Sequence, residues 1–131
     1  MGDIFVSYSI EDKSEGRSIS RLLEEQGYSV FWDPVIPPGQ TFDQVIWEAL
    51  RAAKCVIVLW SARSVKSTWV RAEAEEALQH DKIISILLDD TRVPLQFRSL
   101  QHFDLSDWRG DPEDKNIHHL IAAVRTLVLP S

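Results

Sequence analysis

The amino-acid sequence predicts an α/β protein with an open parallel sheet and helices on both of its faces. Short segments rich in Val, Ile and aromatic residues alternate with longer segments in which apolar residues recur every three to four positions. The segment CVIVLWS at residues 55–61 is apolar almost throughout, which is typical of a strand buried on both faces. Strands and helices that alternate in this way form parallel sheets with right-handed crossovers.

Five segments are predicted to be strands, and the last of them has the weakest pattern. They cover residues 3–9, 28–33, 55–61, 83–89 and 101–105. Ligands of open parallel sheets bind beyond the carboxyl ends of the strands. We therefore expect functional residues where the first four strands end, at residues 7–9, 32–39, 60–63 and 89–92.

The first two predicted helices have recognisable start signals. Ser9 and Asp12 resemble a capping box that opens the first helix, which ends at Gly27. Thr41 and Gln44 form a second capping box, and the apolar residues after them follow the helical period. The remaining two helices are predicted over residues 67–79, with a cap at Ser67 or a neighbour, and over residues 116–129.

Bulk properties narrow the class of protein. The chain has 131 residues, which is enough for one domain with its own core, and we predict a single domain over residues 1–131. Its net charge of -6 argues against nucleic acid or an anionic membrane as a partner. No apolar run is long enough to span a bilayer, and the N-terminus lacks the pattern of a signal peptide. With its single cysteine, Cys55, the chain is predicted to be cytoplasmic and free of internal disulfides.

Several catalytic motifs are missing from the sequence. It has no GxxxxGK[ST] phosphate loop, no GxGxxG after the first strand and no GxSxG elbow. A phosphoacceptor receiver domain would need acidic residues after the first strand and an aspartate after the third, to hold magnesium. The sequences SYS (7–9) and LWS (59–61) stand there instead. We predict no metal site, and we interpret Asp89 and Asp90 as a solvated turn.

The third predicted helix carries three glutamates, Glu73, Glu75 and Glu76. At about 100° per residue its apolar residues form one sector, with Glu73 at the border on the same stripe as Trp69. Glu75 and Glu76 point further outward and are interpreted as a solvated face. A half-buried carboxylate beside an indole can have a raised pKa. Periodicity alone leaves two interpretations of Glu73 open, a solvated acid and a functional one.

Four stretches together resemble a TIR (Toll/interleukin-1 receptor) domain of the bacterial type. They are DIFVSYSIED, GYSVFWDPVIPPGQTF, CVIVLWSARSVKSTWVRAE and FDLSDW, and they follow the family order over nearly the whole chain. The resemblance implies a flavodoxin-like sheet of five strands in the order 2-1-3-4-5. It also implies that residues 1–131 are a TIR domain, either complete in itself or cut from a longer protein.

The resemblance identifies residues 33–41 as the BB loop, through which TIR domains contact one another. The residues expected to make these contacts are Pro34, Ile36, Pro37, Pro38 and Gly39. The prolines stiffen a protruding loop, and glycine permits a backbone angle that other residues resist. Other TIR domains, including further copies of this chain, are therefore the expected protein partners.

Many members of the family cleave NAD at the nicotinamide–ribose bond, with a glutamate four residues after a tryptophan. In this sequence the pair is Trp69 and Glu73, so the resemblance implies that Glu73 is catalytic. It also implies that the substrate is bound by Ser7, Tyr8, Ser9, Trp32, Asp33 and Trp69. Judged from their chemistry alone, Trp32 and Asp33 fit a core-edge tryptophan and a turn aspartate equally well. NAD is the expected substrate, and no cofactor is expected.

The phosphates of NAD are a point at which this sequence departs from some of its family. NAD-cleaving members that have a basic residue after the first-strand tyrosine differ from this chain, which has Ser9 and Ile10 there. Backbone N–H groups at the N-terminus of the first helix are one alternative partner for the phosphates. Arg63 and Lys66 offset the acidic net charge locally.

Two functions follow from the resemblance. The first is an NAD glycohydrolase or ADP-ribosyl cyclase that works when copies assemble, in signalling or defence. The second is a non-catalytic interaction module, either an adaptor or a mimic of host TIR signalling proteins. A nucleotide-binding flavodoxin relative is a third class, and it would need a phosphate loop that the sequence lacks.

Overall fold

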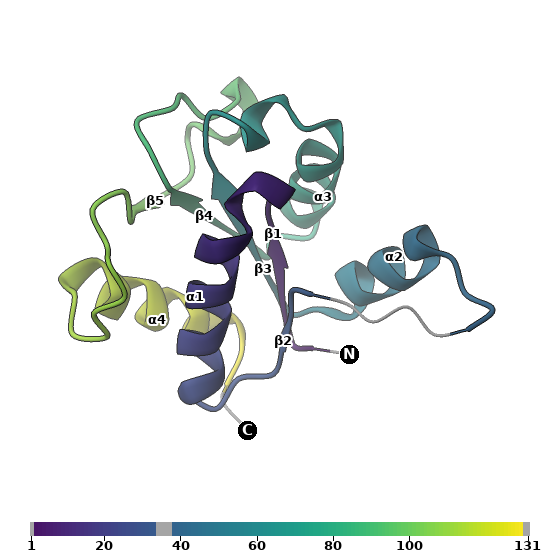
Figure 1. The fold of residues 1–131 in the computed structure, drawn as a ribbon, viewed down its shortest axis with the longest axis horizontal. Coiled ribbons are helices and arrows are strands. Elements are labelled where there is room, and N and C mark those ends of the chain that lie inside the picture. Colours follow the sequence, from purple (N-terminus) through teal and green to yellow (C-terminus); the bar gives the residue numbers. More distant parts are fainter. Residues whose placement is uncertain (1, 34–37, 130–131) are drawn as a thin grey trace.

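The computed structural model describes residues 2–33 and 38–129, and strands alternate with helices along the chain as predicted (Figure 1). The strands are β1 (Ile4–Ser7), β2 (Val30–Phe31), β3 (Cys55–Trp60), β4 (Ile83–Leu87) and β5 (His102–Asp104). The α-helices are α1 (Lys13–Glu25), α2 (Phe42–Ala52), α3 (Thr68–Gln79) and α4 (Lys115–Leu127). Three 3-10 helices lie between them: η1 (Ile10–Asp12), η2 (Ser64–Lys66) and η3 (Leu95–Phe97).

The strands form one parallel sheet in the order β2-β1-β3-β4-β5, which confirms the predicted flavodoxin-like fold. All residues of the central strand β3 are buried, as its unbroken apolar sequence predicted. The edge strand β2 is shorter than predicted, because it pairs with β1 only through Val30 and Phe31. Trp32 and Asp33 therefore lie beyond the strand, where the chain turns away from the sheet.

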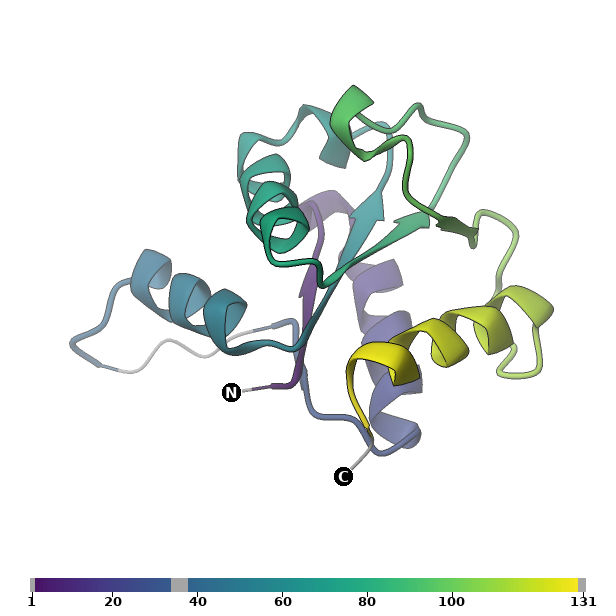
Figure 2. The same cartoon turned by 180° about the vertical axis from the view of Figure 1, so that it is seen from behind.

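Each face of the sheet is covered by two helices. Helices α1 and α4 pack on one face and helices α2 and α3 on the other, so the two pairs lie on opposite sides of the strands in Figures 1 and 2. Strand β1 contributes to both cores, with Ile4 and Val6 toward α1 and Phe5 toward α2. Burial on both faces leaves only the edges and the strand ends of the sheet for a polar site.

Helix α2 projects from the body of the protein, and contacts at both of its ends fix it (Figure 1). At its start the predicted capping box is confirmed: Thr41 Oγ1 accepts from the Gln44 amide at 3.2 Å, and Gln44 Oε1 accepts from the Thr41 amide at 3.1 Å. At its end, Lys82 Nζ donates to the carbonyl of Leu50 in the last turn at 2.9 Å and to the carbonyl of Ala53, just after the helix, at 2.8 Å. These contacts set the position of Phe42, the first residue of the helix.

The capping box predicted for the first helix is wrong, although its end near Gly27 is confirmed by a φ of 96° at that glycine. Helix η1 stands between β1 and α1, and neither Ser9 nor Asp12 caps a helix with its side chain. Asp12 instead points into the protein, where its carboxylate accepts a hydrogen bond from Ser61 Oγ at 2.5 Å. A buried contact with a residue far along the chain has overridden the local pattern.

Candidate active site

A cavity of about 590 Å³ opens at the carboxyl ends of β1 and β2, between the first turns of α2 and α3. Its floor is formed by strand residues and Glu73, its walls by aromatic residues, and its rim by charged ones. The described residues that line it are Phe5, Val6, Ser7, Tyr8, Ser9, Ile10, Glu11, Phe31, Trp32, Phe42, Asp43, Ile46, Arg63, Lys66, Ser67, Trp69, Val70 and Glu73. The cavity thus lies at the end of the sheet where ligands of this fold class bind.

Glu73 is the acidic residue at the floor of the cavity. Helix α3 begins at a cap in which Ser67 Oγ accepts from the Val70 amide at 3.2 Å, as predicted. From this start, Val70, Ala74 and Ala77 pack on the sheet, and Glu73 projects from the edge of that stripe toward β1. Its side chain is only 6% exposed, so it is more deeply buried than its border position predicted.

The Glu73 carboxylate has one strong hydrogen bond from the sheet. Ser7 Oγ, at the end of β1, donates to Glu73 Oε1 at 2.6 Å. Burial raises the pKa of Glu73 to about 7, while hydrogen bonds from Ser7 and from the Trp69 side chain act in the opposite direction. No ion pair to Glu73 is found within residues 2–33 and 38–129. Burial therefore holds the pKa of this carboxylate near neutrality, and no ion pair within the described residues opposes that effect.

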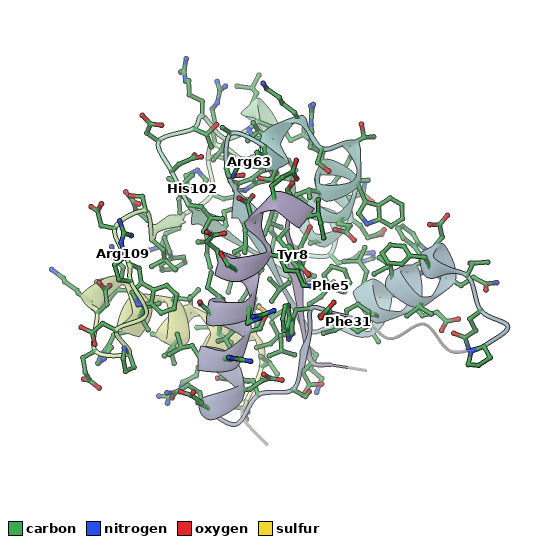
Figure 3. The ribbon with its side chains drawn as sticks, viewed as in Figure 1. Phe5, Tyr8, Phe31, Arg63, His102 and Arg109 are labelled. Carbon is green, nitrogen blue, oxygen red and sulfur yellow. The ribbon has the colours of Figure 1, made fainter. Side chains whose placement is uncertain are left out.

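Aromatic rings flank the carboxylate. The rings of Trp69 and Phe42 lie 6.3 Å apart and join α3 to α2 across the cavity, and both side chains are partly exposed. On the other side, Tyr8 Oη donates to the Trp32 carbonyl at 2.7 Å. Gly16 of α1 makes room for this tyrosine, because a Cβ there would lie 3.3 Å from the Tyr8 ring. Figure 3 shows Tyr8 with Phe5 and Phe31 where β1 and β2 end.

Most of the predicted substrate-binding residues meet in this cavity. Ser7, Tyr8, Ser9, Trp32 and Trp69 all line it together with Glu73. Asp33 does not line it: its carboxylate lies 3.7 Å from Lys13 Nζ and is half exposed. The structure thus places Asp33 at the edge of the site, in an ion pair with α1.

The predicted BB loop falls largely outside the described residues. Pro34, Ile36 and Pro37 belong to the segment that is not described. Pro38 and Gly39 are exposed in a turn just before α2, and Gly39 has a φ of 84°, which other residues rarely adopt. This part of the loop therefore precedes Phe42, a residue that lines the cavity, by only a few positions in the chain.

The other two glutamates of α3 differ from each other. Glu75 is exposed, as predicted. Glu76 is not the fully solvated residue that was predicted, because its side chain is 18% exposed and its Oε2 lies 3.6 Å from His80 Nε2. Neither residue lines the cavity, so Glu73 is the acid of this helix that a ligand there would meet.

The sequence matches the family model for the TIR domain over residues 4–121. The chain belongs to the TIR domain family. It is 29% identical over 108 residues to a protein of Methanobrevibacter olleyae named "Probable 2' cyclic ADP-D-ribose synthase TcpO", a match that covers 78% of this chain. It is also 27% identical over 134 residues to the NAD(+) hydrolase sarm1 of Drosophila melanogaster, a match that covers 90% of this chain.

This TIR domain spans 30% of the length of the first of these relatives and 10% of the second. Its fold is similar to the crystal structure of the TIR domain of the Toll-related receptor TRR-2 from Hydra magnipapillata. The TM-score is 0.82 at 24% identity, over 95% of this chain and 99% of that one. The likeness to the receptor domain shows a shared fold.

One part of the site was missed by reasoning from the sequence. In this TIR domain Asp12 and Arg63 form an ion pair at 3.4 Å, and both are tied to Ser61. Asp12 had been interpreted as a helix cap, and no local signal indicated that it would reach β3. Phe42 was predicted as part of the apolar stripe of α2, but it lies in the cavity wall instead.

The described residues show no other kind of site that was considered. Within residues 2–33 and 38–129, no three His, Cys, Asp or Glu side chains come together in a way that could hold a metal ion. In the same part of the TIR domain, no helix is both long and apolar enough to cross a membrane.

Proposed function

We propose that this TIR domain cleaves the nicotinamide–ribose bond of NAD when copies of it assemble, and that Glu73 is its catalytic carboxylate. The observation that carries the proposal is a buried glutamate at the floor of an aromatic-walled cavity, with no ion-pair partner in the described part of the chain. Two relatives support it by their names, one a cyclic ADP-ribose synthase and the other an NAD hydrolase. Residues 1–131 as a single domain and a cytoplasmic location stay predictions.

The chemistry suits a lone carboxylate. When the bond between ribose C1′ and the pyridinium nitrogen breaks, its electron pair goes to nitrogen and nicotinamide leaves as a neutral molecule. The leaving group therefore needs no proton, whereas the ribose develops the positive charge of an oxocarbenium ion, as in glycoside hydrolysis. An ionised Glu73 stabilises that cation, and it does so strongly because it is removed from water.

The second half of the reaction decides the product. Water adds to C1′ and loses a proton to give ADP-ribose, or a hydroxyl of the substrate adds to C1′ and gives a cyclic isomer. With a pKa of about 7, Glu73 can accept that proton near neutral pH. Both products are compatible with the same carboxylate.

Assembly is part of the proposal because two aromatic side chains that line the cavity are exposed. Phe42 and Trp69 each keep about half of their surface in contact with solvent. Pro38 and Gly39 of the predicted BB loop precede Phe42 by only a few positions in the chain. A second copy that covers these rings would exclude water from the cavity and strengthen the interaction of Glu73 with the developing cation.

The test is nicotinamide release from NAD, followed by chromatography over a series of protein concentrations. We expect the specific activity to rise with concentration, and Glu73→Ala to lower it by about a hundredfold or more. Glu75→Ala is the matched control, because it removes an exposed acid of the same helix outside the cavity. Wild-type protein that releases no nicotinamide at any concentration would contradict the proposal and favour the non-catalytic interaction module.

A further inference from the structure

The rim of the cavity has a basic segment that neither the proposed reaction nor the fold requires. Arg63 and Lys66 are the basic residues among the described residues that line the cavity. Arg63 is the N-cap residue just before η2, and Lys66 is the last residue of this short helix, which leads into α3. Figure 3 shows Arg63 beyond the end of β1, on the far side of Tyr8 from Phe31. Both cations therefore belong to the helix–turn segment that also positions Glu73.

Contacts with Asp12 and Ser61 hold Arg63 in place, while most of its side chain is exposed to solvent. Its Nη1 lies 3.4 Å from Asp12 Oδ1, and its amide donates to Ser61 Oγ at 3.2 Å. Ser61 Oγ in turn donates to Asp12 Oδ2 at 2.5 Å, so the two acceptors are fixed to each other. The Arg63 side chain is nevertheless 60% exposed. A guanidinium has five N–H donors, and most of these remain available to a ligand in the cavity.

Lys66 has no competing partner within the described residues. No ion pair or side-chain hydrogen bond joins its ammonium group to another residue in the ranges 2–33 and 38–129. It is exposed at the end of η2 and lines the same cavity as Arg63. A guanidinium at the N-cap of η2 and an ammonium at its last residue both line the cavity and form a small cationic surface at the rim.

The charge of the surroundings makes this surface significant. The chain has a net charge of -6, and the cavity itself contains the carboxylates of Glu11, Asp43 and Glu73. An anionic ligand would be repelled by these groups unless a local cation compensated for them. Arg63 already acts in this way on Glu11, whose pKa is lowered by a hydrogen bond from Ser9 first and by the Arg63 charge as a smaller contribution.

We propose that Arg63 and Lys66 form a diphosphate-binding subsite, through which the cavity selects a dinucleotide over the corresponding nucleoside. The arginine binds one phosphate through paired N–H donors and the lysine supplies a point charge to the other. The inference rests on the proposed function, in which NAD enters this cavity. It predicts that NAD is preferred to nicotinamide riboside, which has the same scissile bond and no phosphate.

The test compares Arg63→Gln, Lys66→Gln and the double variant on substrates with and without phosphate. We expect each single change to raise the KM for NAD about tenfold and to leave kcat unchanged. Turnover of nicotinamide riboside should not change. Arg21→Gln is the matched control, because Arg21 is exposed on α1 and lies outside the cavity. Binding of ADP and of adenosine by calorimetry gives a second reading that needs no catalysis.

The outcomes separate the subsite from the reaction. Equal losses on NAD and nicotinamide riboside, or ADP binding that is the same in Arg63→Gln and wild type, would overturn the subsite. A wild-type protein that releases no nicotinamide, yet binds ADP more tightly than adenosine in an Arg63-dependent way, would support the subsite and contradict only the proposed reaction. The preference should also weaken as salt is added, and in the double variant this salt dependence should be lost.

Discussion

Two buried carboxylates lie at the same end of the sheet, where the strands have their carboxyl ends, and their surroundings differ. Asp12 is 3% exposed, accepts a hydrogen bond from Ser61 Oγ and has the guanidinium of Arg63 within 3.4 Å. Glu73 is 6% exposed, and no cation pairs with it among the described residues. Burial is the main cause that raises the pKa of both, but only for Asp12 does a neighbouring cation oppose it.

This difference separates an acid that supports the fold from one that does not. Asp12 joins η1 to the segment after β3, because it reaches Ser61 and Arg63 across the end of the sheet. Glu73 makes a hydrogen bond with Ser7, but as an anion it lowers the stability of the folded protein. A residue that costs stability where Gln would fit is expected to be kept for its chemistry.

The largest expected effect concerns the free energy of unfolding of Glu73→Gln. The pKa of Glu73 is raised from 4.5 to about 7, so the folded state binds this proton more tightly than the unfolded chain does. Stability therefore falls as the pH rises from 4.5 to 7, by up to about 3 kcal/mol. We expect Glu73→Gln to gain almost nothing at pH 4 and about that amount at pH 8, measured by urea unfolding across this range.

Asp12→Asn is the control for that measurement. It removes an equally buried charge, but it also removes the partner of Arg63. Burial raises the pKa of Asp12, but the hydrogen bond from Ser61 and the Arg63 charge oppose this, so we expect a smaller gain in stability at pH 8 than in Glu73→Gln. A Glu73→Gln gain that is the same at pH 4 and pH 8 would show that its origin is packing rather than charge, and the contrast between the two acids would fail.

The second effect, of about 2 kcal/mol, is a loss of stability in Asp12→Ala at pH 7. Its main source is the buried hydrogen bond with Ser61, since Arg63 is largely exposed and its ion pair contributes little. Ser61→Ala should cause a similar loss, and the double variant should lose much less than the sum of the two. Fully additive losses in urea unfolding would show that Asp12 and Ser61 act independently.

The contrast between the two acids also shows which features could be predicted from the sequence and which could not. The alternation of apolar strands and amphipathic helices was enough to predict a parallel sheet covered by helices, while the strand order came from the resemblance to TIR domains. The caps at Thr41 and Ser67 were predicted from local spacing. Each of these features depends on residues a few positions apart. The prediction for Asp12 was wrong because it too relied on local spacing, which pointed to a helix cap. The actual partner, Ser61, lies 49 positions away.

Glu73 shows an intermediate case. Helical periodicity placed Glu73 at the border of the buried stripe, and this predicted the side of the helix on which it lies. Its carboxylate accepts a hydrogen bond from Ser7 of β1, and the neighbouring Trp69 contacts Phe42 of the projecting helix α2. Those contacts arise from the packing of separate elements, so the sequence could identify the residue but not its electrostatic environment.

The smallest expected effect tests how Ser7 tunes Glu73. Ser7 Oγ donates to the carboxylate at 2.6 Å, and this hydrogen bond lowers the pKa of Glu73 against the effect of burial. Ser7→Ala should therefore raise the pKa further and move the pH profile of nicotinamide release to higher pH, by about one unit. Activity should approach the wild-type value again at alkaline pH, because the carboxylate is then ionised in both proteins.

Ser20→Ala is the control for this measurement, because it removes a buried hydroxyl outside the cavity and should leave the pH profile unchanged. If Ser7→Ala lowers the rate equally at every pH, then Ser7 positions the substrate, and the pKa of Glu73 does not depend on its hydrogen bond.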